Sequence, residues 1–383
     1  MEFMEPKSIV IVAGEASGDL HASHVVHALR KRHKDLFICG VGGRAMQAAG
    51  AKVLIPADQL AVVGITEVLA KAPVLLKAMA RCKRLLAGLK PDLLMLIDFP
   101  DFNLHLAMAA KKLGIPVLYY ISPQIWAWRS QRVKKIRKRV DHMAVILPFE
   151  SAFYERHGVP VSFVGHPLLD IPNELPETKK TLPDEEPPMI GLLPGSRDRE
   201  VTRLLPTMLE AARILKGKIG PIRLAVSQAP SIDPSLIRQI LTQSGLPDIR
   251  VLNDPVGVLF KQCHLTVVAS GTVTLEAALY ETPMIITYAV SPLSYGLGRM
   301  LVNVPHIGLV NLIAQQRVVP ELVQKAVTAQ SIADAAYPLL TDRAAYERVC
   351  TDLQEVKKRL GQRGASQRVA DIACTLMGCR HAL

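Results

Sequence analysis

An apolar run that ends in a carboxyl group is the first place where the sequence indicates chemistry. In LLMLIDFPDFN, residues 93–103, five apolar residues lead into Asp98, and Asp101 and Asn103 follow. Burial at the end of a strand opposes the charge of a carboxyl group and raises its pKa. Asp98 is therefore either a cap of the turn at Pro100, as Asp often is, or a group placed to take a proton.

A turn between an apolar run and a helix predicts an anion site. In LTVVASGTVTLEAALY, Ser270, Gly271 and Thr272 follow the run, and the first turns of the helix carry Glu276. Free N–H groups and the helix dipole attract phosphate, and Glu276 is placed to accept hydrogen bonds from ribose hydroxyls. An ordinary N-capped helix with a solvent-facing glutamate is the alternative.

A second turn of this kind favours a nucleotide diphosphate. LLPGSRDRE ends an apolar run in Gly195, Ser196 and Arg197, and a guanidinium group suits diphosphate oxygens. The chain has neither a G-x-x-x-x-G-K-[ST] loop nor a G-x-G-x-x-G motif after a strand. The usual signals of an ATPase or of a dinucleotide-binding enzyme are therefore missing.

Near the N-terminus, VAGEASGDLHAS predicts a loop between a strand and a helix. We expect Glu15 and Ser17 to line a ligand site there, because functional loops follow the strands of such sheets. A plain helix cap with Asp19 at its start is the alternative. We interpret CGVGGRAMQAAG, residues 39–50, as a glycine-rich turn without a specific function.

Both tryptophans precede a strongly basic segment. After Trp126 and Trp128, seven of the eleven residues 129–139 are Lys or Arg, which indicates a solvated helix, a nucleic-acid contact or a docking surface for anionic lipid. Residues 60–89 are apolar with interspersed cations, as in a core helix pair broken at Pro73 or a surface for acyl chains. Together the two segments favour lipid over RNA.

These residues need elements that hold them at strand ends. Short apolar runs alternate with helix-period segments, as in a parallel sheet covered on both faces by helices. Because the pattern restarts after a proline-rich stretch, we predict an α/β protein with two doubly wound, Rossmann-like domains facing a cleft. The predicted strands lie within residues 8–14, 91–98, 115–122, 142–149, 189–197, 222–228, 249–254, 265–271 and 283–290.

The predicted domain ranges follow from the same pattern. They are 1–170 for the N-terminal domain, 171–188 for a linker, 189–342 for the C-terminal domain and 343–383 for amphipathic helices. Whether these last helices pack on the N-terminal domain is left open by the sequence.

The composition indicates a globular enzyme with a basic surface. Of 383 residues 49% are hydrophobic, and the net charge of +12 attracts nucleotides, phosphorylated ligands, nucleic acid or anionic membranes, among which charge alone does not choose. The N-terminal apolar run is too short for a signal peptide, so we expect a cytoplasmic protein. The six cysteines form no C-x-x-C pair and lack histidines at zinc-ligand spacing, so we expect reduced thiols and no metal site.

The order of these motifs resembles that of the lipid A disaccharide synthase family, which are inverting glycosyltransferases of the GT-B fold. The motifs are AGEASGD, GVGG, DFPDFN, SPQIWAWR, LPFE, GHPLLD, LLPGSR, ASGTVTLE and NLIAQQRVVPELVQ, which run from residue 13 to about 324. The resemblance implies transfer of 2,3-diacylglucosamine from UDP to the 6-hydroxyl of 2,3-diacylglucosamine 1-phosphate in lipid A biosynthesis. It also implies an N-terminal acceptor domain, a C-terminal UDP-sugar domain and no cofactor.

The resemblance suggests roles for individual residues. A sugar hydroxyl is a poor nucleophile until a base takes its proton, so Asp98 is the predicted general base, with Asp101 as the alternative and Asn103 orienting either one. The chain has no Asp-x-Asp motif, and the turn at 270–272 with Arg197 would stabilise the departing UDP. The substrate-binding candidates besides Asn103 are Glu15, Ser17, Trp126, Trp128, Ser196, Arg197, Ser270, Gly271, Thr272, Glu276, Asn311 and Glu321.

One segment departs from the family pattern. Where relatives tend to read NLLAGRE, this chain has Gln315, Gln316 and Arg317, which removes a glycine from the loop and displaces an arginine.

Acyl chains on both substrates would explain the apolar and basic segments. We therefore expect peripheral association with the inner face of the cytoplasmic membrane and no nucleic-acid partner, and a homodimer is left open. The alternative function is that of another UDP-sugar enzyme with this fold, such as a UDP-N-acetylglucosamine 2-epimerase or a peptidoglycan glycosyltransferase.

Overall fold

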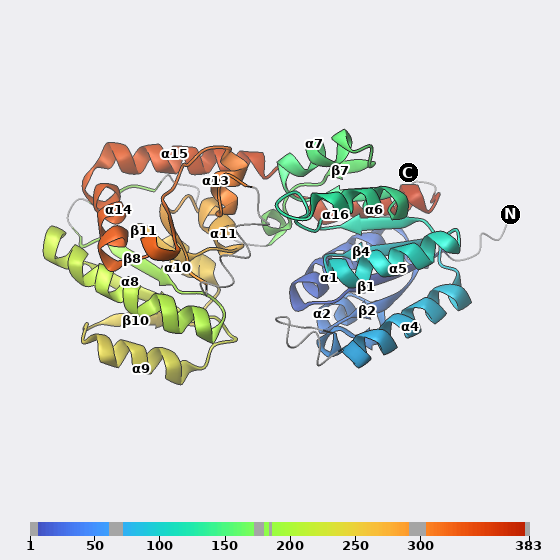
Figure 1. Ribbon diagram of the computed structural model, residues 1–383, viewed down its shortest axis with the longest axis horizontal. Helices are drawn as coiled ribbons and strands as arrows, with labels where there is room; N and C mark the ends of the chain where they lie inside the picture. Colours follow the sequence, from blue (N-terminus) through green and yellow to red (C-terminus); the bar gives the residue numbers. More distant parts are fainter. Residues whose placement is uncertain (1–6, 61–71, 172–179, 184–185, 291–303, 380–383) are drawn as a thin grey trace. The chain divides into compact units, whose positions relative to one another are not determined.

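The computed structural model describes residues 7–60, 72–171, 180–183, 186–290 and 304–379. The chain forms two compact units, one containing residues 1–171 and 360–383 and the other residues 172–359 (Figure 1). The chain therefore leaves the first unit once and returns to it near its C-terminal end.

The first unit is built on a seven-stranded parallel sheet. Its strands are β1 (Ser8–Ala13), β2 (Phe37–Gly42), β3 (Lys52–Pro56), β4 (Leu93–Ile97), β5 (Val117–Tyr120), β6 (His142–Val145) and β7 (Val161–Phe163). Its helices are α1 (Ala16–Arg32), α2 (Arg44–Ala48), α4 (Ala72–Leu89), α5 (Pro100–Lys112), α6 (Val133–Arg139), α7 (Pro148–Arg156) and α16 (Ala365–Leu376), with 3-10 turns η1 (Ala57–Gln59), η2 (Ser130–Arg132) and η3 (Pro167–Asp170). The strand order is β3-β2-β1-β4-β5-β6-β7.

Helices cover both faces of this sheet, which explains why its strands are apolar throughout. Val10 and Val12 of β1 pack in a core with α4, α5, α6 and α7, whereas Ile9 and Ile11 pack in a core with α1, α2 and α16. Successive side chains of a strand point to opposite faces, so a strand covered on both sides needs apolar residues at every position.

The second unit repeats this design on a six-stranded parallel sheet. Its strands are β8 (Met189–Leu193), β9 (Arg223–Ser227), β10 (Ile249–Leu252), β11 (Leu265–Ala269), β12 (Met284–Tyr288) and β13 (Glu321–Val323), in the order β10-β9-β8-β11-β12-β13. Its helices are α8 (Asp198–Ile219), α9 (Pro234–Ser244), α10 (Val256–Gln262), α11 (Val273–Leu279), α13 (Leu309–Ala314), α14 (Ala329–Thr341) and α15 (Arg343–Arg359), with a 3-10 turn η4 (Gln324–Ala326). Ile190 and Leu192 of β8 pack with α8, α9, α14 and α15.

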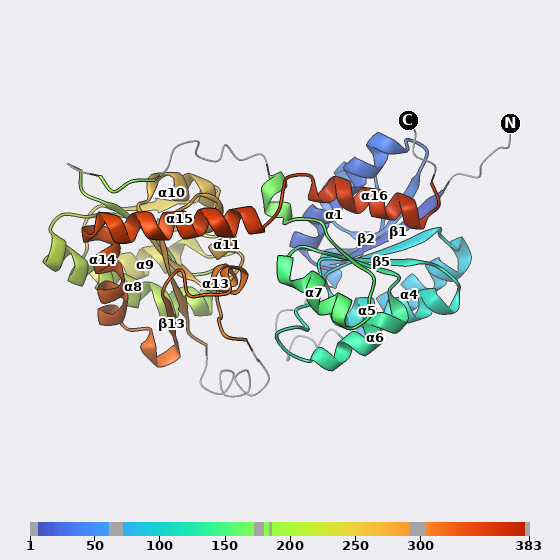
Figure 2. The ribbon, with the colours of Figure 1, turned by 90° about the horizontal axis from the view of Figure 1, so that it is seen from above.

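The helices predicted within 343–383 belong to different units. Tyr346 of α15 is buried in the core of the second unit. Helix α16 packs along α1 in the first unit (Figure 2). The carboxylate of Asp170 fixes the start of α16, because it accepts hydrogen bonds from the backbone N–H groups of Gly364 at 2.6 Å and Ser366 at 3.1 Å.

Each predicted strand range contains a strand, but the sequence analysis missed β2, β3, β7 and β13. The interpretation of residues 39–50 as a glycine-rich turn was wrong for the first four of them, which lie in β2. A Cβ on Gly40 would lie 1.9 Å from the carbonyl oxygen of Ile11, and its φ is +148°. Gly40 therefore allows close approach of β2 to β1, which a turn prediction does not anticipate.

Part of the predicted linker packs on the second unit. Residues 172–179 and 184–185 lie outside the described residues, but Leu182 is buried in the second core. Lys180 donates hydrogen bonds to the backbone carbonyls of Phe260 and Cys263. Residues 180–183 of the predicted linker are thus anchored to the second unit.

Helix α4 covers residues 72–89 of the apolar segment 60–89, of which residues 61–71 lie outside the described residues. It buries Ala78, Cys82 and Leu86, while Leu76 is 70% exposed. Among the described residues, no helix combines the length and the apolar character needed to cross a bilayer.

Candidate active site

In the first unit the strand order reverses between β1 and β4, and candidate residues follow both strands. The two strands pair in parallel with Ala13 opposite Ile97. Glu15 and Asp98 therefore leave the sheet at the same edge. Doubly wound sheets bind ligands at the carboxyl ends of their strands where the strand order reverses. This edge is the first candidate site.

The backbone of Asp98 is held in an uncommon conformation. The φ angles of Asp98 and Phe99 are 46° and 48°, in the left-handed region. The carbonyl oxygen of Asp98 accepts hydrogen bonds from the side-chain amide of Asn103 at 2.7 Å and from the hydroxyl of Tyr119 at 2.6 Å. Both partners are fully buried. Buried side chains therefore hold the turn through the backbone carbonyl of Asp98.

The surroundings of Asp98 make its carboxylate more basic. Burial is the main cause, and the nearby charge of Glu15 adds to it, so that the pKa of Asp98 rises to about 6 although a hydrogen bond from the Phe99 backbone lowers it. A carboxyl group with such a pKa is largely ionised at neutral pH and still able to take a proton in a reaction. This raised pKa is compatible with the predicted role of Asp98 as a general base.

Gly14 and Phe99 connect the motifs AGEASGD and DFPDFN. A Cβ on Gly14 would lie 2.4 Å from the Phe99 ring, so only glycine leaves room for the ring at this loop. The ring also stacks on Phe102 with centroids 5.3 Å apart. We assigned no role to Phe99 or Tyr119 from the sequence, because an aromatic residue beside a motif does not reveal which glycine or carbonyl it contacts.

The other two candidates in DFPDFN have different surroundings. The Asp101 side chain is 75% exposed and forms an ion pair with Arg132 at 2.7 Å. Asn103 is fully buried, and its amide donates to the backbone carbonyls of Ile97 and Asp98. Asn103 therefore supports the backbone of the turn, whereas we had expected it to orient a carboxylate.

At the end of β1 the structure separates ligand candidates from capping residues. Glu15 and Ser17 are exposed at the start of α1. Asp19 is buried, and its carboxylate accepts hydrogen bonds from the backbone N–H groups of Gly43 at 2.6 Å and Ala45 at 3.0 Å. Asp19 thus caps α2, whereas the alternative we considered placed its capping role at α1.

The two tryptophans differ in environment. The indole N–H of Trp126 donates a hydrogen bond to the Glu150 carboxylate at 3.0 Å. Its ring packs edge-on against the ring of Phe149, with centroids 4.7 Å apart. Burial raises the pKa of Glu150 to about 7 although this indole and the Leu147 backbone hydrogen-bond to it. Trp128 is 39% exposed, and the guanidinium of Arg129 lies 4.3 Å from the centre of its ring. Only Trp128 therefore presents a substantial surface to a ligand or membrane.

Helix α6 presents a cationic surface over an apolar base. Val133 and Ile136 are buried, and Arg139 donates to the backbone carbonyl of Leu104 at 3.0 Å. The exposed cations of this segment are Arg129, Lys134, Lys135, Arg137 and Lys138. This arrangement agrees with a solvated basic face and also with docking on an anionic surface.

In the second unit the strand order reverses between β8 and β11, and the two predicted anion turns follow these strands. The strands pair with Leu193 opposite Val268, so the turns at residues 195–197 and 270–272 leave the sheet at one edge. By the same rule as in the first unit, this edge is the second candidate site.

The turn after β8 already surrounds a carboxylate. Glu200 accepts a hydrogen bond from the backbone N–H of Ser196 at 3.1 Å and pairs with Arg197 at 3.1 Å. A Cβ on Gly195 would lie 2.3 Å from a carboxylate oxygen of Glu200. The guanidinium of Arg197 is 67% exposed. These donors thus bind a negatively charged group and remain accessible.

The turn after β11 leaves space around its backbone. Gly271 and Thr272 are exposed, and a Cβ added to Gly271 would meet no atom within 4 Å. Thr272 is the N-cap residue of α11, but its side chain makes no capping hydrogen bond. The ordinary N-capped helix that we considered as the alternative is therefore not observed. Ser270 and Glu276 are half-buried, and burial raises the pKa of Glu276.

Asn311 and Glu321 support a loop. Asn311 is fully buried, and its amide nitrogen donates to the Glu321 carboxylate at 2.7 Å while its oxygen accepts from Val318 and Val319. Glu321 also accepts from the backbone N–H of Gly308 at 3.0 Å. Both side chains are therefore engaged with the protein itself, which we had not anticipated for substrate-binding candidates.

The altered segment after α13 adopts a conformation that suits the missing glycine. Gln315 ends α13 with φ 60° and ψ 20°, in the left-handed region that glycine favours. The displaced Arg317 donates to the carbonyl of Glu321 at 3.0 Å. The loop therefore keeps a helix-ending turn at the position where the family pattern has glycine.

Comparison with known sequences connects this chain to one family. The family model described as Lipid-A-disaccharide synthetase matches residues 9–373. The Lipid-A-disaccharide synthase of Geobacter metallireducens is 46% identical over 376 residues, which are 97% of this chain and 98% of that protein. The corresponding enzyme of Syntrophus aciditrophicus is 45% identical over 378 residues, 98% of this chain and 99% of the relative.

Solved structures share the fold at low sequence identity. A co-structure of S. aureus MnaA with UDP superimposes with a TM-score of 0.65 at 14% identity and covers 98% of both chains. Acinetobacter baumannii MurG gives a TM-score of 0.58 at 15% identity, with 96% of this chain and 99% of that chain covered. The two doubly wound sheets thus form the GT-B architecture that the sequence predicted.

Proposed function

The chain belongs to the lipid-A-disaccharide synthase family and is a glycosyltransferase, and we propose how its residues act on the two lipid substrates. The donor would be UDP-2,3-diacylglucosamine, and the acceptor would be 2,3-diacylglucosamine 1-phosphate. The observation that supports this assignment most directly is Asp98, a carboxylate of raised pKa at the reversal point of the first sheet.

Asp98 acts as the general base of the transfer. Its carboxylate takes the proton of the acceptor 6-hydroxyl while that oxygen bonds to the anomeric carbon of the donor. The bond from this carbon to the β-phosphate oxygen breaks on the opposite face, and UDP leaves with the electron pair. Attack on the face opposite the departing UDP inverts the anomeric carbon and gives the β-1,6 disaccharide 1-phosphate. The Asp98 proton then passes to solvent, which restores the base.

The second unit holds the UDP group at the edge between β8 and β11. Arg197 and the N–H of Ser196 bind the diphosphate and replace their present partner, Glu200. The backbone at 270–272 contributes further N–H groups, and Glu276 accepts hydrogen bonds from the ribose. These donors stabilise the negative charge that develops on UDP in the transition state. Support for this site comes from the open space at Gly271 and the exposure of Arg197.

Asn311 and Glu321 hold the loop before α13 and do not touch the donor in this proposal. Their polar atoms are satisfied by Gly308, Val318 and Val319, so substitution would disturb the loop and act on the donor indirectly. We assign to both a positioning role.

The acyl chains place the reaction at a membrane surface. Exposed Leu76 on α4 and Trp128 before α6 provide apolar contacts, and the exposed cations of 129–138 attract anionic head groups. We propose peripheral binding to the inner face of the cytoplasmic membrane.

The test compares two substitutions in one motif. Asp98→Asn keeps the size and the left-handed backbone, which asparagine tolerates better than alanine, and removes only the base. We expect turnover of the acylated substrates to fall about 10²- to 10⁴-fold, with UDP affinity unchanged. Asp101→Asn, which breaks only a surface ion pair, should stay within about threefold of wild type. Full activity of Asp98→Asn would exclude this base, and turnover of unacylated UDP-N-acetylglucosamine alone would favour an epimerase.

A further inference from the structure

The C-terminal end of α16 brings two cysteines together by a regular helix-ending motif. The backbone N–H of Cys379 donates to the carbonyl of Cys374 at 2.9 Å, and that of Gly378 donates to Thr375 at 3.1 Å. Gly378 has φ +66°. This is the Schellman pattern, in which the residue after the glycine comes to lie beside the residue five positions before it. The motif therefore places both thiols on one side of the helix end.

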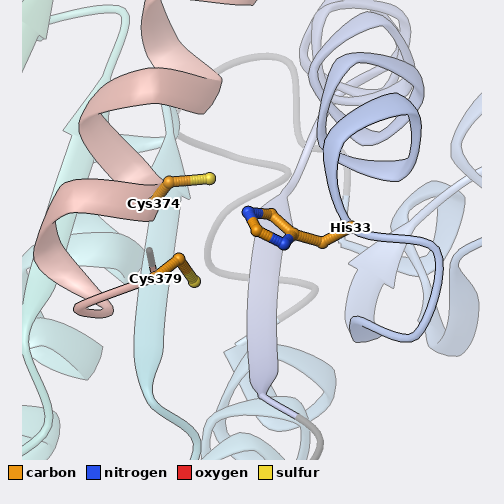
Figure 3. Close-up of side chains that lie close together, drawn as sticks. All are labelled: His33, Cys374 and Cys379. Carbon is orange, nitrogen blue, oxygen red and sulfur yellow. The ribbon is translucent and has the colours of Figure 1, made fainter. Parts of the chain in front are cut away.

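Helix α1 supplies a third group to the same place. His33 ends α1, and the packing of α16 along α1 brings its imidazole to face both sulfur atoms (Figure 3). One nitrogen of His33 and the sulfurs of Cys374 and Cys379 all lie within 4.8 Å of one another. Cys374 is 2% exposed, and the other two residues are half-buried.

We propose that His33, Cys374 and Cys379 bind one Zn²⁺ ion that fastens α16 to α1. Two thiolates and an imidazole are ligands that zinc prefers, and a water molecule completes the tetrahedron. With Zn–S of about 2.3 Å and Zn–N of about 2.0 Å, the ligand atoms of a tetrahedral site lie about 3.5–3.8 Å apart. The three groups therefore need to approach by at most about 1.3 Å, which is within the range of side-chain rotation.

The charges around the cluster agree with a divalent ion. Cys374 and Cys379 are both free thiols. Zinc releases both protons on binding, and the two thiolates then balance its charge. The nearby cation Arg32 is paired with Asp371 at 2.8 Å and does not leave an excess of positive charge beside the site.

The ion would stabilise the first unit at α16, which lies in the separate C-terminal segment of that unit. Residues 360–383 belong to the first unit, but along the chain they are connected to the second unit. Only noncovalent contacts therefore hold them to residues 1–171. A metal that binds the folded unit and not the separated helix shifts the equilibrium towards the packed state. Removal of zinc should therefore lower the thermal midpoint of unfolding and increase proteolysis near α16.

The experiment uses the full-length protein kept reduced and freed of metal with a chelator. Titration with Co²⁺ reports the ligands, because thiolate bonds give charge-transfer absorption in the near ultraviolet and tetrahedral geometry gives intense visible bands. We expect one Co²⁺ per chain, displaced by one equivalent of Zn²⁺. Cys379→Ala and His33→Asn should weaken binding at least about tenfold. The matched control Cys82→Ala removes a buried cysteine of α4, outside the cluster, and should bind as wild type does.

Three results would overturn the proposal. One is Co²⁺ bound without thiolate charge-transfer bands, and another is stoichiometric binding that survives Cys379→Ala. The third is a Cys374–Cys379 disulfide that persists in reducing buffer with zinc present. If Cys379→Ala fails to fold, His33→Asn gives the same test, because its side chain is half-buried at a helix end.

Discussion

The pH dependence of the reaction tests whether Asp98 has the environment that the structure gives it. A general base works in its ionised form, so kcat/KM should be constant above the pKa of Asp98, about 6, and fall tenfold for each pH unit below it. Between pH 7 and pH 5 the expected loss is about tenfold. The acidic limb of the kcat/KM profile reports a group of the free enzyme, and it is measured from initial rates at low substrate concentration.

Replacement of Glu15 by glutamine should move that limb without removing the base. Glu15 is the smaller of the two causes that raise the pKa of Asp98, and burial is the larger. Loss of the Glu15 charge should therefore shift the acidic limb to lower pH by at most roughly one unit. At pH 5 the variant would retain up to about five times more of its own plateau rate than wild type does.

The position of the limb separates this effect from a loss of substrate contact. Glu15 is also a substrate-binding candidate, so its replacement can change the plateau, but only an electrostatic link to Asp98 shifts the pH of the limb. Ser17→Ala is the control, because Ser17 is exposed on the same turn and uncharged. A limb that stays near pH 6 in Glu15→Gln would refute the link, and a limb that remains in the residual activity of Asp98→Asn would refute the base.

Two further predictions concern stability. Gln315→Gly should raise the free energy of unfolding by about 0.5–1 kcal/mol, because Gln315 has φ 60°, which glycine adopts more easily. The control Gln316→Gly should not raise it, because Gln316 lacks a positive φ. Chemical denaturation measures both variants. Burial lowers the pKa of His166 from 6.5 to about 3, so the unfolded chain takes up a proton below pH 6.5 that the folded chain refuses, and stability falls as the pH falls. By pH 4.5 this loss is about 2.7 kcal/mol, which is two pH units at about 1.36 kcal/mol each. His166→Asn should remove it, while exposed His157→Asn should not, and equal slopes in all three proteins would contradict the assignment.

Local sequence predicted most strands of the two sheets, though not β2, β3, β7 and β13, and it indicated the sheet edges where the candidate sites lie. Runs such as 93–97 are apolar at every position because helices cover both faces of the sheet, and this requirement is visible residue by residue. Polar residues that follow such runs must leave the sheet at its carboxyl edge, so Asp98, Arg197 and Ser270 could be identified before any coordinates. Strand β2 was not predicted, because Gly40 serves a close contact with β1 that local sequence does not reveal.

Only the tertiary structure decided which polar groups are engaged and which are available. DFPDFN contains two carboxylates and an amide, and nothing in their spacing shows that Asp101 pairs with Arg132 or that Asn103 holds a carbonyl. The same is true of Asn311, whose partners depend on how the following loop folds back.

The cluster of His33, Cys374 and Cys379 illustrates the limit most clearly. A zinc motif is visible in a sequence when its ligands are close along the chain, and we expected no metal site because the cysteines have no histidine at zinc-ligand spacing; His33 and the two cysteines lie near opposite ends of the chain. Their meeting depends on the return of α16 to the first unit and its packing along α1. Contacts between distant segments are set by the burial of whole helix faces, a property of the folded chain that no short stretch of residues contains.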